Sequence, residues 1–453
     1  MKELDKKMDN TDKLNVEPIG KLLLKFAIPA IIAMTATSLY NIVDSIFIGQ
    51  GVGPMAISGL AITFPFMNLT AAFGALVGAG AATLISIRLG QGEKEQVKKI
   101  FNNMILLNLT LGISIAVISL IFINPILTFF GASENTIGYA REYMVVILLG
   151  NVVTHLYFGI NTVLRSLGHP NKAMQATIQT VLINVILDAL FIFVFHMGIR
   201  GAAIATVCSQ VIALVWQILQ LKNPDITVRF DIKHRKFEKD IVKNIINIGM
   251  PQFIMNAAAC FVAILINKGL MLYGGDFAVG AYGIQNRIVF LFLMISMGLC
   301  QGMQPIAGYN YGAGNYERLM KVFKYSVIFA TAITCCCFIT GTFWGKAVCS
   351  LFTNDGGMIR LSAENLRITV LIMPIIGFQM VTSIFFQSVG KAQVAIILSL
   401  SRQVLFYIPA LLILPKFWAL NGVWYSAPVA DLASATIATI LLLVYLPKLK
   451  TLK

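Results

Sequence analysis

Long apolar stretches separated by short polar segments recur along the whole chain. A helix that crosses a membrane needs about 20 mostly apolar residues, and twelve stretches meet this requirement. Six precede residue 222 and six follow residue 244. The predicted spans are 26–48, 57–87, 100–122, 139–164, 174–196, 199–221, 245–272, 279–306, 322–343, 365–388, 395–414 and 420–446. The pattern therefore predicts an all-α membrane protein with twelve transmembrane helices.

The first half of the sequence aligns with the second half at a constant offset of 222 residues, which we call the repeat register. Each half has six predicted helices, an even number, so both halves enter the membrane in the same direction. Parallel repeats of this kind are related by a pseudo-two-fold axis along the membrane normal, with the transport cavity at their interface. The aligned positions are Pro29 with Pro251, Gly80 with Gly302, Gly90 with Gly312, Gly92 with Gly314, Phe130 with Phe352, and Ser166 to Gly168 with Ser388 to Gly390.

The repeat predicts two six-helix lobes joined by a basic segment. Residues 1–24 are polar and mixed in sign, without the apolar core and small-residue cleavage site of a signal peptide. The linker carries seven Lys or Arg residues and would tether two bundles that rock against each other. The predicted parts are an N-terminal tail (1–24), an N-lobe (25–221), a linker (222–244), a C-lobe (245–447) and a C-terminal tail (448–453).

Composition and charge support a membrane protein and indicate its orientation. Hydrophobic residues make up 57% of the chain and charged residues 12%, against about 45–50% and about 25% in soluble domains. Of the 35 Lys and Arg residues, 26 lie on one face of the predicted topology and 7 on the other. Since cytoplasmic loops are enriched in Lys and Arg, both termini are predicted to be cytoplasmic. A net charge of +15 located in these loops does not indicate nucleic-acid binding. The cysteines mostly fall in apolar stretches, where they act as small hydrophobes, so no disulfide framework is expected.

Acidic residues inside predicted spans are the main candidates for chemistry, because a charge at mid-membrane costs about 2.5–3.5 kcal/mol. Asp44 lies in "YNIVDSIFIG", where Tyr40 and Asn41 share its helical face. Asp188 lies in "NVILD", one turn after Asn184. Both acids are predicted near the outer ends of outward-running helices, in the N-lobe.

Asp44 and Asp188 are predicted at depths in the membrane that allow their side chains to come into contact, and Thr206 of the sixth helix is predicted at a similar depth. Two carboxyl groups with amide and hydroxyl neighbours in a low-dielectric site can hold a proton or coordinate Na⁺ through oxygen. The alternative is a structural hydrogen-bond cluster that fixes helix packing. The coupling interpretation is favoured.

The C-terminal half has a different set of charges inside its predicted spans. Asp431 is expected to pair with Arg402, because a buried charge normally needs a partner, and a structural role is favoured for that pair. Arg287 has no obvious acidic neighbour in its lobe. Three roles remain possible for the Arg287 side chain: it could snorkel to the membrane surface, bind a backbone carbonyl group or face the cavity.

Several chemical classes are excluded by the absence of their motifs. "GTFWGKA", which begins at Gly341, has the wrong glycine spacing for a phosphate loop, so no ATP site is expected. The four histidines show no metal-ligand spacing. No catalytic constellation is present, so the sequence predicts neither an enzyme nor a protein with an organic cofactor or metal site.

A family resemblance emerges from several segments taken together. These are "FAIPAI", "YNIVDSIFIG", "LRSLG", "NVILD" and "GAAIAT", within the six-plus-six repeat. The chain resembles the multidrug and toxic compound extrusion (MATE) family over essentially its whole length, and is similar to its MepA-like and DNA-damage-inducible-protein-F-like bacterial branch.

The resemblance implies a bacterial inner-membrane antiporter, a monomer, that exports lipophilic or cationic small molecules as H⁺ or Na⁺ enters. By this resemblance, the cation site of the branch corresponds to Asp44, Asn184, Asp188 and Thr206, and Pro29 corresponds to the proline associated with bending of the first helix. Another bacterial branch uses acids in helices seven and ten, and those helices contain no transmembrane carboxylate here.

Two further functions are kept as alternatives. A flippase or exporter for a lipid-linked or amphipathic metabolite would usually have a markedly basic cavity, for which only Arg287 and Arg402 are candidates. An intramembrane enzyme or lipid-bound receptor is disfavoured, because no nucleophile or metal constellation is found.

Overall fold

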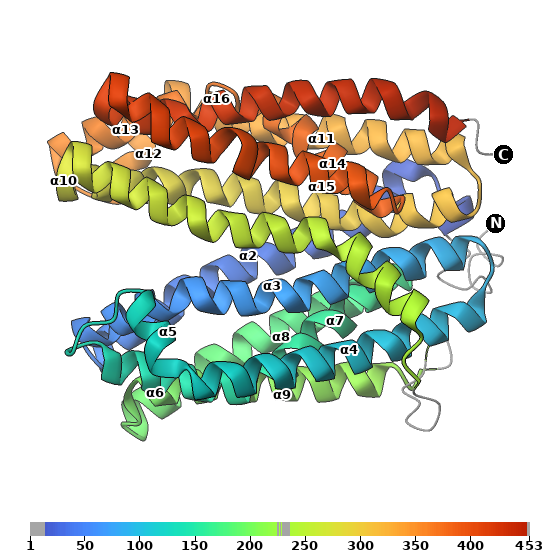
Figure 1. Cartoon of the computed structure of the whole chain (residues 1–453), viewed down its shortest axis with the longest axis horizontal. Coiled ribbons are helices and arrows are strands. Elements are labelled where there is room, and N and C mark those ends of the chain that lie inside the picture. Colours follow the sequence, from blue (N-terminus) through green and yellow to red (C-terminus); the bar gives the residue numbers. More distant parts are fainter. Residues whose placement is uncertain (1–13, 224–225, 227, 229–235, 451–453) are drawn as a thin grey trace. The chain divides into compact units, whose positions relative to one another are not determined.

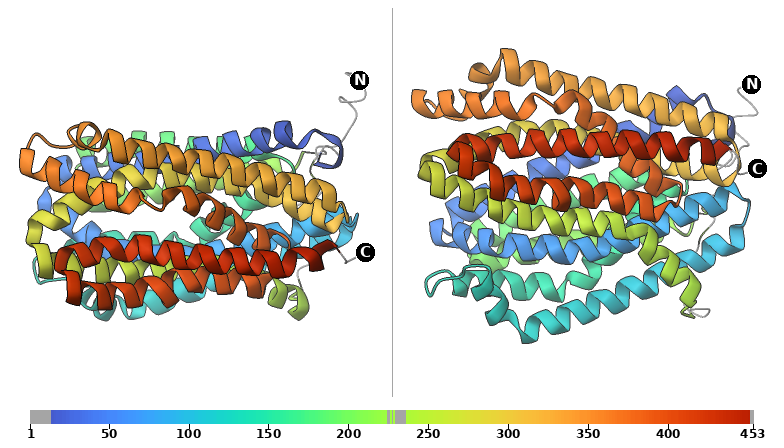
Figure 2. Two further views of the ribbon diagram at one scale, coloured as in Figure 1. Left: turned by 90° about the horizontal axis from the view of Figure 1, so that it is seen from above. Right: turned by 45° about the horizontal axis from the view of Figure 1, so that its top comes forward.

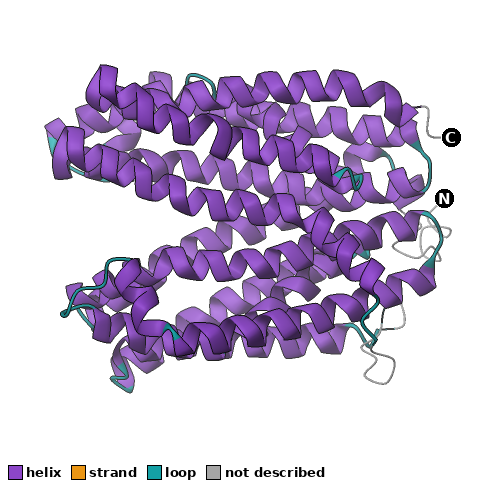
Figure 3. Ribbon diagram, in the orientation of Figure 1, coloured by secondary structure: helices purple, strands orange, loops and turns teal. Residues whose placement is uncertain are grey.

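The computed structural model describes residues 14–223, 226, 228 and 236–450 (Figure 1). Most of the predicted N-terminal tail, much of the predicted linker and residues 451–453 lie outside this part of the chain, as does the side chain of Asn41. Every regular element in the described residues is a helix, and most connections are short (Figure 3). The all-α prediction is confirmed.

The helices of the first repeat run from α2 to α9. Their bounds are α2 (Ile19–Gly51), α3 (Pro54–Gly90), α4 (Lys94–Ile121), α5 (Ile123–Phe129), α6 (Ile137–Leu149), α7 (Asn151–Ser166), α8 (Pro170–Ala189), the π-helix η1 (Leu190–Val194) and α9 (Gly198–Gln220).

The helices of the second repeat run from α10 to α16. Their bounds are α10 (Lys239–Gly312), α11 (Tyr316–Phe343), α12 (Gly345–Cys349), α13 (Gly356–Val370), α14 (Met373–Ser388), α15 (Ala392–Leu400), the π-helix η2 (Ser401–Tyr407) and α16 (Ile408–Lys450).

The number of membrane spans agrees with the prediction. Eight helical stretches in the described residues are long and apolar enough to cross a membrane. Two of them, α10 and the α15–α16 stretch, contain a break, at Gly275 and at Trp418 with Ala419, so each comprises two spans. The pairs α6–α7 and α13–α14, bent by 54° and 52°, supply two more. The described residues therefore contain twelve spans, although the bends, the short helices α5 and α12 and the π-helices were not predicted.

The repeat register recurs in the structure. The first residues of α4, α5, α7 and α8 are equivalent in this register to the first residues of α11, α12, α14 and α15, respectively. The aligned glycines Gly92 and Gly314 have φ angles of 78° and 68°, values that a residue with a Cβ rarely adopts. Both follow the end of a long helix, so the repeat preserves the turn that closes it.

The backbone packs into two compact units. Unit 1 contains Ile32–Phe253 and unit 2 contains Pro18–Ile31 together with Ile254 onward. These units divide the chain differently from the predicted lobes, since the first part of α2 belongs to unit 2 and the first part of α10 to unit 1. In each helix the change falls two residues after a proline, Pro29 in α2 and Pro251 in α10.

Glycines allow these initial helical segments to pack closely. In unit 1, a Cβ on Gly80 of α3 would overlap with the carbonyl group of Ile245 in α10. In unit 2, a Cβ on Gly302 of α10 would overlap with the backbone of Ala27 in α2. Because small residues let helix backbones approach within a membrane, the aligned glycines explain why both segments pack where they do.

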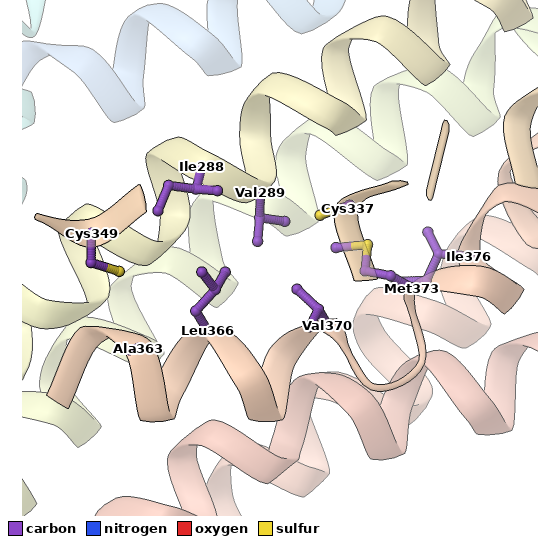
Figure 4. Close-up of a cluster of buried hydrophobic side chains, with 9 residues drawn as sticks. All are labelled: Ile288, Val289, Cys337, Cys349, Ala363, Leu366, Val370, Met373 and Ile376. Carbon is purple, nitrogen blue, oxygen red and sulfur yellow. The ribbon is translucent and has the colours of Figure 1, made fainter. Parts of the chain in front are cut away.

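Within each unit the helices run roughly along one direction (Figure 2), and apolar side chains fill the interior between them. One cluster in unit 2 joins α10, α11, α12, α13 and α14 (Figure 4). Cys337 and Cys349 belong to it, with Leu366, Val370 and Met373 among their neighbours. These two cysteines therefore serve as small hydrophobes, as predicted.

Candidate functional site

Four helices of unit 1 place polar side chains in one buried cluster. Asp44 comes from the second half of α2, Asn184 and Asp188 from the last turns of α8, and Thr206 from α9. Asp44 is 6% exposed, Asn184 1% and Asp188 0%. Tyr143 of α6 completes the set and is 3% exposed. We call this group the carboxyl cluster.

Asp44 and Asp188 lie in direct side-chain contact, within hydrogen-bonding reach of each other. Oδ1 of each residue is buried and has no hydrogen-bond donor among the described residues. Two carboxyl groups in contact form a hydrogen bond only when one is protonated, and two bare charges at this separation would repel strongly. A proton or a cation shared by the two carboxyl groups would remove this repulsion.

Asn184 connects Asp188 to α9. With its amide oxygen facing the backbone N–H of Thr206 at 3.1 Å, Asn184 donates from Nδ2 to Asp188 Oδ2 at 2.8 Å. The bond is charge-assisted when Asp188 is ionised, and such bonds are stronger than neutral ones. Asn184 therefore fixes the orientation of the Asp188 carboxyl group.

Two tyrosines lie beside Thr206 in the cluster. Tyr40 Oη lies 3.3 Å from Thr206 Oγ1, and the side chain of Tyr143 lies close to Thr206 and to both carboxyl groups. Tyr143 was missed in the sequence because it belongs to no recognisable motif; it directly follows Arg141 and Glu142 near the start of the span 139–164. Its contribution comes from the packing of α6 on α9.

Local features of α8 and α9 bring these groups together. The helical ladder widens into the π-helix η1 two residues after Asp188, and π-helical turns frequently accompany functional sites. In α9, Ala202 and Ala203 are fully buried in an apolar cluster with Tyr143. The small residues of "GAAIAT" thus allow α9 to approach its neighbours closely.

The cluster presents carboxyl, amide and hydroxyl oxygens without sulfur or imidazole. Oxygen donors suit hard cations such as Na⁺, and a close carboxyl pair also suits a single proton. Four of the oxygen-bearing residues, Asp44, Asn184, Asp188 and Thr206, are those that the family resemblance selected. The structure brings all four together, with Tyr40 beside them.

Apart from Asn41, whose side chain lies outside the described residues, the other predicted site residues belong to unit 2. Arg402 Nε donates to Asp431 Oδ1 at 2.7 Å, so the predicted pair is present. Arg287 is exposed on α10, and Pro29 is buried within α2. None of these residues joins the carboxyl cluster.

Comparisons with known proteins agree with the repeat. The MatE family model matches residues 29–190 and 251–412, two segments that are equivalent in the repeat register. The multidrug export protein MepA of Staphylococcus aureus (strain MRSA252) is 30% identical over 430 residues, which cover 95% of this chain and 94% of that protein. MepA of Staphylococcus haemolyticus is 29% identical over 420 residues, covering 93% and 92%.

Solved structures show the same fold. An outward-facing MATE family transporter of the MOP superfamily has a TM-score of 0.90 at 25% identity, covering 97% of this chain and 98% of that one. A MATE protein solved in a bent conformation gives a TM-score of 0.91 at 25% identity, covering 98% of each chain. A MATE protein solved in a straight conformation gives a TM-score of 0.89 at 25% identity, covering 97% of this chain and 98% of that one. This multi-pass membrane chain therefore belongs to the MatE family of multidrug and toxic compound extrusion transporters.

Proposed function

We propose that this protein is an antiporter that exports multiple drugs or small organic, often cationic, metabolites in exchange for H⁺ or Na⁺. The observation that carries the proposal is the contact between two buried carboxyl groups, Asp44 and Asp188. Charged groups are costly inside a membrane and are associated with ion pathways and proton relays. A pair whose repulsion a proton or a cation would remove is a suitable coupling site.

The coupling would act through a change in the charge of the pair. Loss of the bound cation leaves two negative charges in contact, and their repulsion favours a state in which α2 and α8 separate. Export follows if substrate binds the two states differently, since a ligand shifts a conformational equilibrium only through differential affinity. Alternating access between two lobes meets this requirement.

Pro29 supplies a site where α2 can bend. Proline lacks the N–H that would bond to the preceding turn, and kinks in helices concentrate at such positions. MATE proteins solved in a bent and in a straight conformation support conformational change in this family. We infer that bending near Pro29 accompanies the change in charge at Asp44.

We infer a location in the bacterial inner membrane from the bacterial MepA relatives. The distribution of basic residues supports an orientation with both termini in the cytoplasm. In this orientation Asp44 and Asp188 lie toward the outer face. The coupling cation would then enter from outside as substrate leaves.

Purified protein in liposomes tests the proposal. A fluorescent cationic dye is loaded, and its efflux is followed after an inward gradient of H⁺ or of Na⁺ is imposed. We expect efflux with at least one gradient, and its loss in Asp44→Asn and Asp188→Asn. Asp276→Asn, which changes an exposed aspartate of α10, is the matched control. Unchanged efflux in both cluster variants would refute the assignment.

The flippase alternative can be compared in the same vesicles. A lipid-linked diphosphate needs several cations in the cavity, but Arg402 is already paired with Asp431. Gradient-independent movement of a labelled anionic lipid, without dye efflux, would favour that alternative.

A further inference from the structure

A groove of about 450 Å³ lies in unit 2 where α2 and α11 begin. It is separate from the carboxyl cluster, which belongs to unit 1. We call it the basic groove. Its walls include Ile19 and Lys21 of α2 and Arg318, Lys321, Tyr325 and Phe329 of α11.

The wall formed by α11 changes from cationic to aromatic along the helix. Lys321, Tyr325 and Phe329 follow one another at intervals of four residues, so they share one helical face. Tyr325 is 40% exposed and Phe329 38%. This face therefore presents one cation near the start of the helix and two large rings beyond it.

The α2 helix repeats the same order. Lys21 is exposed in its first turn, and Leu24 and Ile28, spaced along the same side, are 44% and 51% exposed. The two walls meet where Tyr325 approaches Gly20: a Cβ added to Gly20 would lie 3.8 Å from the Tyr325 ring. The basic groove thus has cations at the helix starts and apolar surface toward the middle of the spans.

We propose that the basic groove binds one anionic phospholipid. Its phosphate would lie between Lys21, Lys321 and Arg318, and an acyl chain would run along Tyr325 and Phe329. Basic pockets between transmembrane helices bind anionic head groups, and arginine binds phosphate through a planar fork of donors. The sequence of cationic and then apolar surface matches the order of head group and chain in a lipid.

The equivalent position in the other repeat already holds an anion. Lys321 and Lys21 correspond, in the repeat register, to Lys99 and Lys243 of unit 1. There Lys99 Nζ lies 3.5 Å from the carboxylate of Glu238, and Asn103, the counterpart of Tyr325, accepts a hydrogen bond from the Glu238 backbone at 2.9 Å. The chain thus fills this position with its own acidic residue in one repeat.

Polar neighbours in α10 and α11 already contact cations of the basic groove. Arg318 Nε donates to Asn310 Oδ1 at 3.2 Å, a bond that orients the guanidinium group. Glu317 forms an ion pair with Lys321, but the two side chains are 79% and 57% exposed. Exposed ion pairs of this kind contribute little to stability. A phosphate that engages Arg318 and Lys21 as well can therefore displace Glu317 from Lys321.

Native mass spectrometry of the purified full-length protein tests the proposal. Phosphatidylglycerol and phosphatidylcholine with identical acyl chains are added separately. We expect one phosphatidylglycerol to bind to the wild-type protein, and the double variant Lys21→Gln/Lys321→Gln to bind it about tenfold more weakly. The control Lys94→Gln/Lys98→Gln removes two exposed lysines elsewhere and is expected to leave binding unchanged.

Further arms distinguish the ligand source and guard against misfolding. Inorganic phosphate at millimolar concentration is expected to leave phosphatidylglycerol bound, because it lacks the acyl chains that contact Phe329; displacement would mean that the groove binds phosphate alone. Equal binding of both lipids to the wild-type protein, or equal phosphatidylglycerol binding by both double variants, would overturn the proposal. The wild-type comparison of lipids remains decisive if the groove variant fails to fold.

Discussion

Arg402 of η2 donates from Nε to Oδ1 of Asp431 in α16, at 2.7 Å. The arginine side chain is 24% exposed and the aspartate side chain 9%, so neither charge is fully solvated. The two residues neutralise each other's charge, so neither of their two spans carries an isolated charge.

Breaking this pair on one side is expected to destabilise the protein. Arg402→Met leaves a buried carboxylate without its partner, at a cost of about 3 kcal/mol. Replacing both residues, as Arg402→Met/Asp431→Leu, removes both charges and is expected to restore most of the lost stability. Thermal unfolding in detergent measures the difference. A double variant as unstable as the single one would contradict a purely pairwise role.

The second prediction concerns Thr206, whose hydroxyl group contacts Tyr40. Thr206→Val keeps the shape but leaves the Tyr40 hydroxyl group without this partner, which costs about 1–2 kcal/mol. We expect lower thermal stability and slower dye efflux. Thr206→Ser retains the hydroxyl group and serves as the control, with efflux close to that of the wild type. Equal efflux in the valine and serine variants would show that the hydroxyl group is dispensable.

The third prediction concerns the close packing of α2 against α10. Gly302→Val places a branched side chain against the backbone of Ala27, and overpacking of this kind costs about 1–3 kcal/mol. Gly283→Val, on the same helix, meets nothing within 4 Å and brings the same change in helix propensity. We expect only Gly302→Val to lower the melting temperature clearly. Similar melting temperatures for the two variants would argue against a tight contact between α2 and α10.

Much of the fold and most of the carboxyl cluster could be predicted from the sequence. Apolar length identifies the spans, and the glycines at Gly92 and Gly314 mark equivalent turns because few other residues adopt their φ angles. Asp44 and Asp188 stand out because acids are rare in spans. Tyr143 does not stand out, because a tyrosine near the end of a span is ordinary and its role depends on which helix packs beside it.

The division into units was likewise beyond local pattern. Nothing in the sequence near Pro29 indicates that the preceding turns of α2 pack with α10, since that contact joins residues far apart in the chain. The same holds for the π-helix after Asp188, where the backbone hydrogen-bond pattern changes from α-helical to π-helical without a proline or glycine at the transition. Long-range packing decides both features.

The last prediction separates the two prolines that the repeat aligns. Pro29 lies fifteen residues before Asp44 on the same helix, about 22 Å along its axis. Pro251 occupies the equivalent place in α10, but the counterparts of Asp44 and Asp188 are the apolar residues Ile266 and Ala410. Bending at Pro29 can therefore respond to charge, whereas bending at Pro251 has no carboxyl group at the equivalent positions to respond to.

Alanine at either position restores a backbone donor and stiffens the helix. We expect Pro29→Ala to slow gradient-driven dye efflux several-fold while dye binding to the detergent-solubilised protein stays unchanged. Pro251→Ala is the matched control and is expected to slow efflux less. If the two variants slow efflux equally, proline matters as a general feature of both helices and not through the carboxyl cluster. If neither slows it, α2 does not need this bend for transport.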